Sequence, residues 1–101
     1  MNIVSTYFND GLKCLDKASY NEAIVLLRQV LVHYPNNAIA YNNIGIAQTH
    51  IGINQRNKYL LESSIQYFQK AIAIIELIPG YTYPIALKNL KWAKEELNKL
   101  V

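Results

Sequence analysis

The chain repeats itself with a period of 34 residues, and this period is interrupted once. Gly11 and Gly45 are separated by 34 positions, whereas Leu27 and Phe68, also similar in character, are separated by 41. A repeat of about this length is typical of helix–turn–helix units that stack on one another, because a single unit cannot bury its apolar face alone. The sequence therefore predicts two stacked helical units, the second longer than the first.

A single insertion of seven residues explains the change of spacing. Gly52 still follows the 34-residue spacing from Ala18, and Leu61 is the first residue to follow the longer one. We place the insertion near residues 53–59. Seven residues are close to two helical turns, so a helix lengthened by this amount keeps its buried face in phase. A longer fourth helix that starts near Asn54–Asn57 is favoured over the alternative, a flexible loop.

The composition fits a single all-α domain over residues 1–101. The chain is 51% hydrophobic and 17% charged, and its four Gly and three Pro leave long stretches rich in helix-forming residues. We expect five helices: an antiparallel pair in repeat one (4–37), an antiparallel pair in repeat two (38–79) and a capping helix (84–100). Pro84 suits the first turn of that last helix.

Short polar motifs predict where helices begin. In "SYNE" the hydroxyl of Ser19 can accept from the amide of Glu22 while the Glu22 side chain reaches back, which is a capping box. Asn36 or Asn37, after the first repeat, can cap the helix that follows.

The repeated unit resembles the tetratricopeptide repeat, a helix–turn–helix of 34 residues. The matching residues of the first unit are Tyr7, Gly11, Tyr20, Ala23, Leu27, Leu31 and Pro35. Those of the second are Tyr41, Ile44, Gly45, Gly52, Ser64, Phe68, Ala71 and Ile72. The resemblance implies an α–α superhelix, a right-handed solenoid of antiparallel helix pairs. It also implies that Gly11 and Gly45 are small so that the paired helices can pack closely.

In this family the first helix of each unit lines a concave groove, and the resemblance carries that role to specific residues. The peptide-binding groove would comprise Phe8, Leu12, Leu15, Ile39, Asn42, Asn43, Ile46, Thr49 and His50. The carboxylate clamp of some family members is not expected, because Phe8 and Leu12 stand at two of its positions. A groove this apolar suits an amphipathic helix or an extended peptide.

These observations favour a protein–protein interaction module, a scaffold or adaptor whose partner is another protein or peptide. The groove side chains could instead simply bury against neighbouring helices. A second hypothesis is self-association into a homo-oligomer, because two repeats are fewer than the three usually needed for stability. Nucleic-acid binding ranks third. It rests on a net charge of +3 and the row Lys88, Lys91 and Lys94, without aromatics interleaved among basic residues.

Two further features could contribute to binding. The insertion would project a polar, basic set of side chains as a second contact site, namely Gln55, Arg56, Lys58 and Tyr59, although a tolerated surface insertion is the alternative. Trp92 on the capping helix could pack inside the domain or form the edge of a groove.

The sequence predicts neither an enzyme nor a metal or cofactor site. Cys14 is the single cysteine, and His33 and His50 are far apart, without a cluster of ligating residues around either. No phosphate-binding loop or nucleophile motif is present, so we expect no catalytic residues. The most apolar run, 71–79, is too short to span a membrane, and "MNIVSTYFND" lacks signal-peptide features, so we expect a cytoplasmic protein.

Overall fold

A computed structural model describes residues 2–100, and this part of the chain contains five α-helices and no strand. The two terminal residues of the predicted domain, 1 and 101, lie outside the described residues. The helices are α1 (Ile3–Asp16), α2 (Tyr20–His33), α3 (Ala38–Gln55), α4 (Lys58–Glu76) and α5 (Pro84–Asn98). The predicted all-α class, with five helices and Pro84 in the first turn of the last one, is confirmed.

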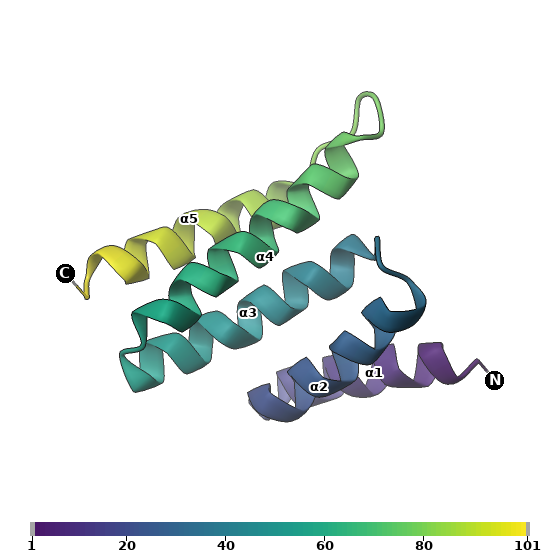
Figure 1. The fold of residues 1–101 in the computed structure, drawn as a ribbon, viewed down its shortest axis with the longest axis horizontal. Helices are drawn as coiled ribbons and strands as arrows, with labels where there is room; N and C mark the ends of the chain where they lie inside the picture. Colours follow the sequence, from purple (N-terminus) through teal and green to yellow (C-terminus); the bar gives the residue numbers. More distant parts are fainter. Residues whose placement is uncertain (1, 101) are drawn as a thin grey trace.

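Each helix packs against the next one in the chain, and α3 contacts all four others. Figure 1 shows α3, α4 and α5 lying side by side, with α1 and α2 as a further pair. The molecule measures 45 × 34 × 19 Å, and its shortest dimension is close to two helix diameters. The helix α3 also contacts both α1 and α5, and the open sides of these three helices are called here the inner face.

Small residues set the distance between paired helices. A Cβ atom added to Gly45 would lie 2.6 Å from Cε1 of Phe68, and one added to Gly11 would lie 3.0 Å from Cγ of Leu27. Phe68 and Leu27 are fully buried, so neither side chain has open space to move into. The expectation that Gly11 and Gly45 allow close packing of the paired helices is confirmed.

The insertion is helical, but it does not lengthen the fourth helix alone as predicted. By the 34-residue spacing α3 would end at residue 50, and it ends at Gln55 instead. By the 41-residue spacing α4 would begin at residue 61, and it begins at Lys58. Only Arg56 and Asn57 separate the two helices, so residues 53–55 belong to α3. Extra residues on both helices of an antiparallel pair can cover each other, which a one-sided extension could not do.

The lengthened pair keeps its buried faces in register. A Cβ atom added to Gly52 would lie 2.9 Å from the Leu61 side chain. This contact repeats the one between Gly45 and Phe68. Both the glycines and their partners are seven residues apart, two helical turns, so the same face of each helix is used twice. The predicted preservation of phase is therefore confirmed.

Both hairpins turn through a residue with left-handed backbone. Ala18 has φ 59° and Arg56 has φ 50°. After each of them, the N–H of Ser19 or Asn57 donates to the carbonyl five residues earlier, at 2.8 Å in both cases. This is the hydrogen bond of the Schellman motif, which ends a helix abruptly.

Asparagines begin the two helices of the second repeat. Oδ1 of Asn37 accepts from the Ala40 N–H at 3.0 Å, and Oδ1 of Asn57 accepts from the Tyr59 N–H at 3.0 Å, so the predicted cap at Asn37 is confirmed. The predicted capping box at Ser19 is wrong, because its side chain makes no cap hydrogen bond. The backbone N–H of Ser19 instead makes the hydrogen bond that ends α1. The ψ angle of Ser19 is 68°, whereas Asn37 and Asn57 are extended, with ψ angles of 98° and 101°.

Candidate functional site

The predicted groove residues differ in how far solvent reaches them. Ile39 is exposed, and the half-buried residues are Phe8, Leu12, Leu15, Asn43, Ile46 and His50. The two polar residues Asn42 and Thr49 are buried, with relative exposures of 4% and 0%. The groove predicted from the sequence is thus only partly open to a ligand.

The two buried polar residues hold the fold together instead. Oδ1 of Asn42 accepts from Nδ2 of Asn89 at 3.1 Å, which ties α3 to α5. Oγ1 of Thr49 donates to the carbonyl of Gly45 within the same helix, at 2.7 Å. Since each has an internal partner, Asn42 and Thr49 are not available to bind a ligand, and we leave them out of the candidate site.

The apolar residues of the inner face also divide into two kinds. Phe8 and Leu15 pack against a buried cluster that includes Leu27 and Ile44, so they serve the core. Leu12 and Ile46 are half-buried but belong to none of the buried clusters found in residues 2–100. Phe8 and Leu15 therefore fit the alternative in which groove side chains bury against neighbouring helices. Leu12 and Ile46 remain as candidate apolar contacts for a partner.

Three aromatic rings form a continuous cluster between α2, α3 and α5. The ring of Tyr20 stacks on His50 with centroids 4.7 Å apart and an interplanar angle of 8°. The ring of Trp92 meets His50 edge-on at 5.1 Å. Burial lowers the pKa of the His50 imidazole, which favours its neutral form at neutral pH. The cluster joins α2, α3 and α5, and it combines apolar ring faces with polar N–H and O–H groups.

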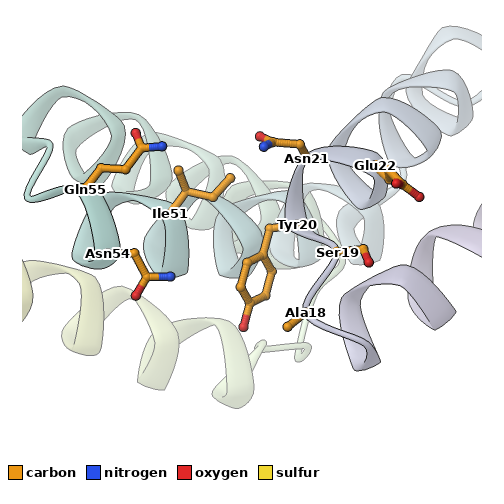
Figure 2. A pocket seen from close by; sticks show the side chains of 8 residues that line it. All are labelled: Ala18, Ser19, Tyr20, Asn21, Glu22, Ile51, Asn54 and Gln55. Carbon is orange, nitrogen blue, oxygen red and sulfur yellow. The ribbon is translucent and has the colours of Figure 1, made fainter.

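A pocket of about 350 Å³ lies next to this cluster, between the α1–α2 turn and the lengthened end of α3. Figure 2 shows that Tyr20 and Asn54 point toward α5, whereas Asn21 and Gln55 point to the opposite side. Tyr20 lines the pocket and also stacks on His50, so the pocket continues the aromatic surface. Two residues of its lining, Asn54 and Gln55, belong to the inserted segment.

The predicted second contact set is brought together at the α3–α4 turn. All four side chains are exposed, namely Gln55, Arg56, Lys58 and Tyr59. With Asn57 they line a depression of about 330 Å³. Nζ of Lys58 lies 5.3 Å from the centroid of the Tyr59 ring, a cation–π distance. The insertion therefore presents one contiguous polar, basic tip.

The sequence suggested separate roles for His50 and Trp92 and a packing role for Tyr20. It did not predict that the three rings meet, because their contact depends on the register of α5 against α3. It also missed the pocket residues Ser19 and Asn21. The signal that could have found them is the lengthening of α3 beyond the α1–α2 turn.

Within residues 2–100 no group of three or more His, Cys, Asp or Glu side chains could hold a metal ion. No helix of this part of the chain is both long and apolar enough to cross a membrane. No known family model matches the chain, and no curated protein is significantly similar to it. Fold and site together define an all-α protein of packed helix pairs with a mixed aromatic and aliphatic inner face.

Proposed function

We propose that this chain is a protein–protein interaction module of the tetratricopeptide type, which binds an amphipathic helix or an extended peptide of a partner on its inner face. The observation that carries the proposal is the pair of half-buried side chains Leu12 and Ile46, which lie outside the core clusters on two contacting helices. Aliphatic anchors of this kind receive the apolar face of a helix at i, i+3 and i+4 spacing.

The chemistry around these anchors supports a peptide as the ligand. Tyr20 and Trp92 are residue types enriched at protein interfaces, because their rings give large contact area and keep one polar group. Asn54 and Ser19, which line the adjacent pocket, supply hydrogen-bond donors and acceptors that can pair with a peptide backbone. A partner side chain could therefore enter the pocket while its helix or strand lies against Leu12 and Ile46.

The test compares charge substitutions on two faces. The double variant L12K/I46K places two ammonium groups on the inner face, and Q29K/V32K places them on α2, where both residues are exposed. Tagged protein is recovered from its native cells, and the partners of each variant are compared by mass spectrometry. We expect the inner-face variant to lose partners that the α2 variant keeps.

Circular dichroism and thermal unfolding are measured on both variants, so that loss of binding is separated from loss of folding. If L12K/I46K is folded and retains every partner of the parent chain, the proposed inner-face function is wrong.

A further inference from the structure

A second groove lies between α2 and the lengthened ends of α3 and α4, and we call it the outer groove. Its volume is about 330 Å³. Its polar lining comes from Asn21, Arg28, Gln48 and Gln55, and its apolar lining includes Val25 and Leu60. Asn21 and Gln55, which point away from α5 in Figure 2, line both this groove and the Tyr20 pocket. Arg28, Gln48 and Leu60 line this groove and not that pocket.

Gln48 gives the outer groove an unused hydrogen-bond acceptor. The residue is only 4% exposed, and its Oε1 is buried without a hydrogen-bond partner in the described part of the chain. Buried polar atoms are nearly always paired in folded proteins, because losing water without a replacement costs folding free energy. An N–H donor arriving in the groove would remove that cost, and a peptide backbone carries one at each non-proline residue.

Arg28 gives the groove its charge. It is exposed, it is the charged member of the lining, and no ion pair involves it within residues 2–100. A guanidinium binds carboxylates through two parallel hydrogen bonds, so the charge selects an acidic group. The side-chain amides of Asn21 and Gln55 can complete the pairing of a nearby backbone.

The apolar lining of the groove favours a ligand with an aliphatic side chain. Val25 is 60% exposed although it is aliphatic, and Leu60 is half-buried. An aliphatic side chain held against them would lose its contact with water, which favours binding. Gln55 lies in the insertion and Leu60 directly follows it.

From these three features we propose that the outer groove binds an extended peptide segment of a protein partner with an aliphatic residue beside an acidic one. The Gln48 side chain turns its Oε1 into the groove to accept from a backbone N–H of the segment. The carboxylate of the segment pairs with Arg28, and its aliphatic side chain packs on Val25 and Leu60. Arg28, Gln48 and Leu60 lie outside the Tyr20 pocket, so this site goes beyond the function proposed for the inner face.

The experiment titrates the ¹⁵N-labelled full chain with two blocked tripeptides, N-acetyl-Ala-Leu-Asp-amide and N-acetyl-Ala-Leu-Asn-amide. The Asp peptide should shift the side-chain resonances of Gln48 and Arg28 and bind about tenfold more tightly than the Asn peptide, since only the former pairs with the guanidinium. Arg28→Gln should remove this difference. Lys13→Gln removes one positive charge from α1, at an exposed residue that does not line the groove, and should leave the difference unchanged.

Gln48→Met is the second variant, because it replaces the unpaired acceptor with an apolar group of similar length. It should raise the melting temperature and weaken binding of the Asp peptide by about tenfold, a gain in stability at the expense of function.

The proposal is overturned if neither peptide moves the outer-groove resonances at millimolar concentration. It is also overturned if Q48M lowers the melting temperature and binds the Asp peptide as the parent does, since the amide would then be satisfied by an ordered water. Shifts confined to Leu12 and Ile46 would overturn it as well, while supporting the inner-face function.

Discussion

Single glycines decide how closely the two helices of each pair approach. Gly45 faces the ring of Phe68 across the α3–α4 contact, and Gly11 faces Leu27 across the α1–α2 contact. In an open helix position an alanine would be preferred over glycine by up to ~1 kcal/mol. Replacing each glycine with alanine is therefore expected to change stability by different amounts, because the space for a methyl group differs at the two contacts.

We predict that Gly45→Ala destabilises the protein by roughly 1–3 kcal/mol, since the new Cβ would lie 2.6 Å from a fully buried ring. At Gly11 the closest atom is 3.0 Å away, so the clash and the gain in helix propensity should nearly offset each other. Urea denaturation of both variants measures the difference. Equal stability of Gly45→Ala and the parent would refute this account of the contact.

His50 should make stability depend on pH. Burial lowers its pKa in the folded state, whereas the unfolded chain has the ordinary value of about 6.5. Above that pH the imidazole is neutral in both states, and below it the unfolded state binds more protons. Stability should therefore be complete above about pH 6.5 and fall as the pH drops through the lower, folded pKa.

The test follows the free energy of unfolding from pH 7.5 to 5 in the parent chain and in His50→Phe, which keeps an aromatic ring but cannot titrate. The variant should lose part of the pH dependence. His33→Gln is the matched control, because it replaces the other histidine, which is exposed at the end of α2. An unchanged slope in His50→Phe would contradict the expected role of His50.

At the scale of helices, the insertion is the feature that shapes the surface. It adds residues to the end of α3 and to the start of α4, and these residues reach both the Tyr20 pocket and the outer groove. The core contacts of Gly45 and Gly52 keep the same phase, so the surface changes while the packing of the pair is preserved.

Removal of residues 54–60 together with Ile53→Ser should therefore leave a folded protein. Gly52 would take the place of Ala18, whose φ is 59°, and glycine accepts that conformation without strain. Circular dichroism should show a helical protein with a single thermal transition, and the outer groove should no longer bind the Asp tripeptide. Loss of the cooperative transition would contradict the view that the inserted residues are dispensable for folding.

For the whole molecule, local patterns predicted more of the fold than of the site. Five helices, the cap at Asn37 and the close approaches at Gly11 and Gly45 depend on short-range pattern or on one repeat spacing, and the structure agrees. The division of the insertion between two helices was not predictable, because either helix could lengthen in phase.

The position of α3 explains why part of the predicted groove is buried. This helix contacts all four others, so most of its circumference is buried and only a narrow stripe with Ile39, Ile46 and His50 stays open. Asn42 and Thr49 follow the same spacing as Ile46 yet lie inside. Likewise, the meeting of His50 with Trp92 depends on how α5 docks, which local sequence does not specify.

If the inner face binds a segment of another protein, site-specific photo-crosslinking in the native cells should capture that contact. A photoreactive p-benzoylphenylalanine replaces Ile46 on the inner face or, as the matched control, Val32 on α2. We predict that the probe at position 46 cross-links to an amphipathic helix or extended segment of a different protein, and that the probe at position 32 does not. Equal cross-linking from both positions, or cross-links from position 46 only to other copies of this chain, would contradict the claim.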